Sequence, residues 1–339
     1  MLGLQPPEGR YLILIDKLNQ KRLLLFLAFA FGIAWLISLV IALQGGLSQS
    51  PLLIPELNLS LAAALLAGGV MMAPALANLL ARLLTREGKA GLWLKPARYE
   101  DPWRYWLLAW LLPAIGTILG ALLYFALFPP AFDSQLESLR AMLSAAAPDQ
   151  NVSPWVYLLT NTLQAVLLAP ILNAIFCFGE EYGWRAYLLP KLLPLGNRKA
   201  VLLSGLIWGL WHAPIIAMGH NYGLDYPGFP WLGILAMIWF CVALGTFFSW
   251  LTLKEGSVWP AVIGHGALNG IAALGLLAQK GAPNTLLGPA PTGLIGGLFF
   301  TLLALALLLK PDALAPGKEK WRPEPILLPD EPPPAPPPI

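Results

Sequence analysis

Long, continuously apolar segments separated by short polar connections dominate this chain. Eight of them are long enough to cross the hydrocarbon core of a bilayer, which takes about 20 residues of α-helix. Their apolar positions do not alternate, which excludes β-strands as the spanning elements. The pattern therefore predicts an all-α, polytopic membrane helix bundle of about eight transmembrane helices, over residues 23–43, 58–81, 105–128, 155–179, 200–217, 230–252, 257–278 and 290–309.

Composition and charge agree with a membrane protein. Of the 339 residues, 57% are hydrophobic and 12% are charged, whereas a soluble domain carries about 25% charged residues. All Lys and Arg residues except Arg140 and Lys280 fall on one side of an eight-helix bundle, together with both termini. Because basic connections stay in the cytosol, we expect a multi-pass protein of the cell (plasma) membrane with cytosolic N- and C-termini. The net charge of +3 follows this topology, and no nucleic-acid partner is expected.

The chain divides into three regions. Residues 1–22 are expected to form a cytosolic N-terminal segment, and residues 23–310 form the transmembrane helical domain. Residues 311–339 are rich in proline, so a disordered tail is expected there. A short amphipathic helix is expected near residues 134–143. Prolines inside three apolar segments are expected to kink their helices: Pro74, Pro113 and Pro170.

Two adjacent acidic residues, Glu180 and Glu181, follow the fourth apolar segment. A carboxylate at membrane depth is costly unless it is paired or hydrated, so it is a candidate functional group. Glu181 and Arg185 are one helical turn apart and can form an ion pair. Glu180 is rotated from Glu181 by about 100° and can face a reaction. The alternative is a charged helix end at the cytosolic interface.

Two further pairs of residues share the four-residue spacing of one helix face. His212 follows Trp208, and Asn269 follows His265. Trp208 and Trp211 are expected to line a substrate pocket beside His212. Asn269 either bonds a neighbouring helix or donates to a developing oxyanion. Each histidine alone could equally be a hydrogen-bonded core residue.

The remaining histidine and the cysteines lie outside these motifs. His220 follows the fifth apolar segment and is expected to be a solvated loop residue. Cys177 and Cys241 lie inside apolar segments and are expected to be small core residues. Two such cysteines form neither a disulfide framework nor a zinc cluster.

In order and spacing, the three motifs resemble those of the CPBP family, the CAAX-protease and bacteriocin-processing (Abi-type) intramembrane endopeptidases. That family's pattern is Glu-Glu-x-x-x-Arg, then aromatic-x-x-x-His, then His-x-x-x-Asn, on successive membrane helices. Trp208 stands where Phe is commoner. The resemblance covers about residues 155–275, which would be the catalytic core. It implies hydrolysis of a peptide bond in a membrane-associated or lipidated substrate, as in CAAX-type processing.

The resemblance also implies a role for each motif residue. Glu180 would act as the general base that activates a water. His212 and His265 would position that water or stabilise the tetrahedral intermediate, with Asn269 as a further oxyanion donor. The remaining motif residues would orient Glu180: Glu181 and Arg185.

The sequence leaves open whether a metal takes part. Glu180, His212 and His265 are a candidate zinc-ligand set with a vacant position for water. The chain lacks His-Glu-x-x-His, however, so the usual zincin geometry is absent. We favour a metal-free, glutamate-activated water, and zinc remains the candidate cofactor.

The depth of these residues sets a condition on the structure. If the fifth helix begins at Lys199, His212 lies roughly 20 Å along it, whereas Glu180 is near the cytosolic edge of the fourth segment. The two can meet only if both helices extend into the cytosol, so that Glu180 lies deeper than the apolar pattern suggests.

Three other functions are alternatives. A rhomboid-type serine protease needs Gly-x-Ser-Gly, and the nearest run, Leu202-Leu203-Ser204-Gly205, lacks the first glycine. A proton-coupled membrane transporter could use intramembrane Glu and His, but inverted repeats would be expected with it and none is found. A non-catalytic membrane immunity or scaffold protein would keep the motifs and act by binding.

Overall fold

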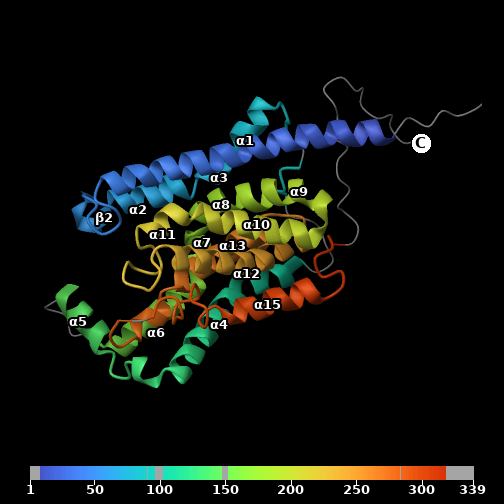
Figure 1. Cartoon of the computed structure of the whole chain (residues 1–339). Helices are drawn as coiled ribbons and strands as arrows, with labels where there is room; N and C mark the ends of the chain where they lie inside the picture. Colours follow the sequence, from blue (N-terminus) through green and yellow to red (C-terminus); the bar gives the residue numbers. More distant parts are fainter. Residues whose placement is uncertain (1–7, 90, 96–101, 147–151, 283, 318–339) are drawn as a thin grey trace, which may run out of the picture.

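Helices make up nearly all of the secondary structure in the part of the chain that the computed structural model describes, residues 8–89, 91–95, 102–146, 152–282 and 284–317 (Figure 1). The predicted all-α membrane bundle is thus confirmed. The α-helices are α1 (Glu8–Leu43), α2 (Leu61–Leu65), α3 (Ala73–Leu84), α4 (Pro102–Leu127), α5 (Glu137–Ala146), α6 (Pro154–Leu167), α7 (Ala169–Leu172), α8 (Ala174–Gly183), α9 (Leu189–Leu192), α10 (Asn197–Trp211), α11 (Ala213–Ala217), α12 (Trp231–Glu255), α13 (Trp259–Ile271), α14 (Leu274–Leu277) and α15 (Leu298–Leu309).

Short elements of other types complete the chain. Two π-helical turns, η2 (Leu66–Val70) and η4 (Trp184–Leu188), continue α2 and α8. Three 3₁₀ turns lie in connections: η1 (Pro55–Leu57), η3 (Pro129–Ala131) and η5 (Leu193–Leu195). A small antiparallel ribbon, β1 (Leu52–Ile54) and β2 (Leu59–Ser60), follows α1. The helix α5 lies in the connection where a short amphipathic helix was expected.

Five helical stretches within the described residues are long and apolar enough to cross a membrane. They are Leu18–Leu43, Leu61–Leu84, Trp103–Leu127, Trp231–Glu255 and Trp259–Leu277. Each coincides with one of the eight predicted segments. The other three segments are helical but broken or short, so the number of eight crossings stays a prediction.

The breaks have local causes. The predicted segment 155–179 contains α6, α7 and most of α8, which part at Leu168 and Asn173. Pro170 is at the start of α7 and has no N–H to extend the preceding helix. Pro74 likewise stands at the start of α3, whereas Pro113 lies inside α4 without ending it.

The eighth predicted segment, 290–309, is helical only over α15. The residues before α15 pack tightly against α4. A Cβ atom at Gly120 of α4 would overlap the carbonyl group of Gly296. This close backbone contact, and the glycines and prolines that precede α15, replace the first half of the expected helix.

The helices form successive layers, which Figure 1 shows from top to bottom as α1 with α3, then α8 and α10, then α13 and α12, then α4 and α15. The main packing pairs are α1 with α3, α3 with α8, α10 with α12, α13 with α4, and α12 with α15. The stretch from α8 to α13 therefore lies in the middle of the bundle, where α1, α3, α4 and α15 cover it.

The ends of the chain continue this packing. α1 begins at Glu8, so most of the expected N-terminal segment is one helix with the first span. Leu314, in the first part of the expected tail, is buried, and the amide of Gly317 donates to the carbonyl of Leu253. Residues 1–7 and 318–339 lie outside the described residues.

Candidate active site

The helix α8 carries Glu180 and Glu181 and lies between α3 and α13. Two glycines allow the start of α3 to approach closely: a Cβ atom on Gly179 would overlap the backbone of Met71, just before α3, and one on Gly183 would overlap Pro74 in α3. The helical stretch does not end there but continues through η4 and α9 to Leu192. Glu180 is therefore inside a longer helical stretch and not at its end, while its depth in the membrane stays a prediction.

Glu181 is fully buried and contacts two nitrogen-bearing side chains. Nη1 of Arg185 lies 3.1 Å from its Oε1 atom, and Nδ1 of His265 lies 2.8 Å from the same oxygen. The guanidinium carbon of Arg185 lies 4.3 Å from the ring centre of Trp208 and 5.4 Å from that of Phe248. The carboxylate and the two aromatic faces offset the cost of burying the guanidinium charge.

Glu180 has a different environment although it is the next residue. Its side chain is buried, and Nε1–H of Trp208 donates a 2.7 Å hydrogen bond to Oε2. Among the described residues its carboxylate makes no ion pair, in contrast to that of Glu181. Glu180 can therefore offer a carboxylate oxygen to a water molecule.

Both histidines are held through the same ring nitrogen. Nδ1 of His212 lies 2.8 Å from the backbone carbonyl oxygen of Trp208. A carbonyl oxygen only accepts, so Nδ1 carries a proton, and Nε2 is the acceptor of the neutral ring. The same argument holds for His265, whose Nδ1 faces the carboxylate of Glu181. Each ring keeps Nε2 for water or substrate.

Asn269 lies one turn after His265 on α13, and its Nδ2 atom lies 3.5 Å from Sγ of Cys177. Sγ of the other cysteine, Cys241, lies 3.9 Å from Nδ1 of His212. Both cysteines are buried and form no disulfide. They are core residues, as expected, and they also contact the candidate site.

A cavity of about 160 Å³ brings most of the predicted site residues together. The predicted residues on its wall are Glu180, Trp208, Trp211, His212, His265 and Asn269. Glu181 and Arg185 are fully buried behind this wall. Much of the apolar wall comes from η2, the residue after η2 and α12: Leu66, Val70, Met71, Met237, Phe240 and Leu244.

The cavity also reaches residues that the sequence did not identify. His220 is half-buried on the cavity wall, so the expectation of a solvated residue was wrong, and burial lowers its pKa. Asn221 and Thr292 line the same region. The hydroxyl of Tyr222 joins their two loops by donating to the carbonyl of Thr292 at 2.9 Å. Polar residues in loops after apolar helices are common, so no sequence signal distinguished these three.

The candidate metal ligands were tested against their placement. Glu180, His212 and His265 line one cavity. Within the described residues, however, no three His, Cys, Asp or Glu side chains are grouped closely enough to hold a metal ion. The residues present do not fit a preformed zinc site, and no step of the chemistry below passes through a metal.

Residues 155–271 match the family model described as type II CAAX prenyl endopeptidase Rce1-like. A curated protein of Methanococcus maripaludis named CAAX prenyl protease 2 is 33% identical to this chain over 107 residues. That alignment covers 31% of this chain and 38% of the relative, so the chain spans less than half the length of the relative it matches. The family match contains all three motifs, whereas α1, α3, α4 and α15 lie outside it.

Proposed function

We propose that this chain, whose residues 155–271 match the Rce1-like family model, is an intramembrane endopeptidase of the CAAX-processing type. Its substrate would be a membrane-associated or lipidated peptide. The name of the methanococcal relative supports this substrate class. The apolar wall of the cavity supports it as well, because it offers a lipid chain a surface next to the polar residues.

The observation that carries the proposal is the convergence of Glu180, His212, His265 and Asn269, from three helices, on one cavity. Peptide hydrolysis needs a base for water, a group to hold that water, and donors for the oxyanion. The four side chains can supply all three functions. Glu181 and Arg185 act from behind the wall as positioning residues.

In the proposed reaction the Glu180 carboxylate removes a proton from a water molecule, and the water oxygen attacks the carbonyl carbon of the scissile peptide bond. The carbonyl oxygen becomes the oxyanion of a tetrahedral intermediate. As the C–N bond breaks, the proton held by Glu180 passes to the leaving nitrogen. The products are a carboxylic acid and an amine, and Glu180 is a carboxylate again.

The two histidines have different proposed roles, which follow from their hydrogen-bond partners. His212 donates from Nδ1 to a backbone carbonyl, so its Nε2 accepts a hydrogen bond from the attacking water. His265 contacts the Glu181 carboxylate through Nδ1, and in its protonated form it would donate from Nε2 to the oxyanion. Asn269 provides a further donor.

Glu180→Gln in the purified, lipid-reconstituted protein tests the assignment. It keeps the size of the side chain and removes the base, so cleavage of a prenylated peptide should be lost while Tm is retained. Ser204→Ala is the matched variant, because Ser204 is the serine that the rhomboid alternative would use. Full activity in Glu180→Gln, or loss of activity in Ser204→Ala, would reject the assigned base.

Metal removal tests the proposed metal-free mechanism. The enzyme is dialysed against a strong chelator, its metal content is measured, and peptide cleavage is assayed. Turnover should be unchanged. Loss of turnover that returns with added zinc would contradict the metal-free mechanism.

We also propose that the protein lies in the plasma membrane with both termini in the cytosol. Nearly all Lys and Arg residues fall on the side of the bundle that holds the termini, and basic connections stay in the cytosol. Exposed Ser48, before β1, and exposed Lys89, after α3, would then lie on opposite sides. In intact cells a membrane-impermeant thiol reagent should label Ser48→Cys but not Lys89→Cys. The reverse pattern would invert the topology.

A further inference from the structure

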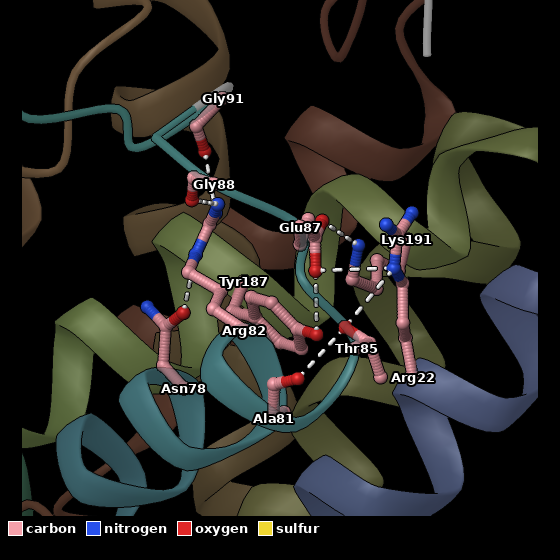
Figure 2. Close-up of polar contacts among 10 residues, drawn as sticks. All are labelled: Arg22, Asn78, Ala81, Arg82, Thr85, Glu87, Gly88, Gly91, Tyr187 and Lys191. Carbon is pink, nitrogen blue, oxygen red and sulfur yellow. Dashed lines mark hydrogen bonds and ion pairs between the residues drawn. The ribbon is translucent and has the colours of Figure 1, made fainter. Parts of the chain in front are cut away.

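A charged cluster at the end of α3 joins residues before the family match to residues within it, and Figure 2 shows its contacts. Its centre is the carboxylate of Glu87, whose side chain is 11% exposed. Nζ of Lys191 lies 2.6 Å from one of its oxygens, the hydroxyl of Tyr187 donates to the other at 2.9 Å, and Nε of Arg22 lies 3.4 Å away. Glu87 thus joins α1 to η4 and α9.

A second set of contacts begins on α3 itself. The buried amide of Asn78 donates to the backbone carbonyl of Tyr182 at 2.9 Å and accepts from Nε of Arg82 at 2.8 Å. The other nitrogens of Arg82 donate to the carbonyls of Gly88 and Gly91, so the loop that carries Glu87 is fixed by the same residue (Figure 2).

These contacts hold the helical stretch that carries the proposed base, Glu180. They reach it at two points, one after Glu181 and one after Arg185. Tyr182 directly follows Glu181, and Tyr187 follows Arg185 by two residues. Between them the helix changes to the π-helix η4, a form that often occurs at functional sites. Because a π-turn changes the rotation of the helix, the residues beyond it do not by themselves fix the direction of Glu180.

We infer that Glu87 and Asn78 are positioning residues of the reaction, which fix the rotation and depth of the stretch from α8 to α9 and so aim Glu180 at the cavity. The inference rests on the proposed function. Its physical reason is that a shift of about 1 Å in a reacting group can lower the rate by a factor on the order of 100. Residues 22–91, outside the family match, would thereby belong to the working enzyme.

The test compares Asn78→Leu, Glu87→Gln and Tyr187→Phe with Lys89→Gln, which removes an exposed charge from the same loop. In reconstituted protein, well below every Tm, kcat on a lipidated peptide should fall at least about tenfold in the first two variants. KM should not change. Tyr187→Phe removes a single hydroxyl, so it should give a smaller loss of kcat, and it tests the inference even where the other two variants fold poorly. Glu87→Asp keeps the charge and should restore part of kcat. Lys89→Gln should match the wild type.

Hydrogen exchange of a peptide that covers α8 and η4 is measured on the same samples, because it does not depend on activity. Exchange should be faster in Asn78→Leu and Glu87→Gln than in Lys89→Gln. Unchanged kcat per folded enzyme, or a change in KM in place of kcat, would overturn the inference while leaving the protease intact. A wild type that cleaves no peptide would instead reject the proposed function. If hydrogen exchange in the variants were then also unchanged, Asn78 and Glu87 would not hold the stretch from α8 to α9 either.

Discussion

Glu180 and Glu181 are adjacent in the chain but have different partners. The indole N–H of Trp208 donates to Glu180, whereas Arg185 and His265 contact Glu181. The two glutamate side chains point about 100° apart around the helix, which places one on the cavity wall and the other in the core. The same chemical group can therefore supply a base at one position and a structural anion at the next.

Glu181→Gln should impair both stability and turnover. The variant leaves Arg185 as an uncompensated buried charge, so the free energy of unfolding should fall by about 3–5 kcal/mol. It also loses the anion that orients His265, so kcat should fall by a factor of about 10–100. Thermal melts and steady-state kinetics measure the two effects.

The double variant Glu181→Gln/Arg185→Met is the control, because it removes both charges together. Stability should recover in the double variant while turnover stays low. If the single variant keeps both its Tm and its kcat, Glu181 has neither role.

Trp208 contributes more than the aromatic wall that was expected of it. Its indole N–H bonds Glu180, its ring lies against the guanidinium of Arg185, and its carbonyl holds His212. The sequence placed Trp208 and His212 on one face of a helix. It could not predict the bond to Glu180, because that bond depends on how closely α10 approaches α8.

Trp208→Phe should keep an aromatic ring and lose the indole N–H. We expect kcat/KM to fall about tenfold, the equivalent of about 1.4 kcal/mol. Trp110→Phe is the matched control, because it removes a 2.7 Å indole hydrogen bond to Val166 away from the site. Equal kcat/KM values in the two variants would show that the bond to Glu180 does not contribute to catalysis.

At the scale of elements, the contact between α3 and α8 sets the position of the candidate base. The sequence predicted both helices, but it gave no sign of which helices would meet. The break at Asn173 was also not predicted. The amide of Asn173 donates to the carbonyl of Gly266 on α13, so a distant helix satisfies a polar group that the sequence shows inside an apolar run.

Gly183→Ala should loosen this contact. A Cβ atom there would overlap Pro74 in α3, and such overpacking costs about 1–3 kcal/mol. Tm and turnover should both fall, because α8 must move away from α3. Gly68→Ala is the same change at an exposed position where a Cβ atom meets no neighbour, and it should not lower Tm. A Gly183→Ala protein as stable as Gly68→Ala would contradict the tight contact.

At the scale of the whole molecule, the sequence predicted the class of fold, eight apolar segments that include the five long apolar helices, and the motif residues that line the cavity. These features follow from hydrophobic periodicity and from motifs of four-residue spacing, which are local properties. The packing order of the layers, the loops that carry His220 and Thr292, and the cluster around Glu87 depend on contacts between distant segments. Arg22, Glu87 and Lys191 looked like ordinary cytosolic charges in the sequence, and only the fold makes them one cluster.

That cluster predicts how the stability of the molecule depends on pH. Burial by itself raises the pKa of Glu87, but the charges of Lys191, Arg22 and Arg82 and the bond from Lys191 outweigh it, so its pKa lies below the ordinary value of 4.5. The folded protein therefore binds this proton less tightly than the unfolded chain does. The stabilisation is fully present above pH 4.5 and is lost as the pH falls through the lower pKa of the folded state.

Melting curves of the wild type and of Glu87→Gln between neutral and acid pH test this dependence. At pH 7 the variant should melt at a lower temperature, because Lys191 and Arg22 lose their carboxylate. The difference in Tm should shrink below pH 4.5 as the wild-type carboxyl group becomes protonated. Glu56→Gln, at an exposed position beyond β1, is the control for removing one carboxylate. A difference between wild type and Glu87→Gln that stays constant down to acid pH would show that Glu87 does not link α1, the end of α3 and α9 through its charge.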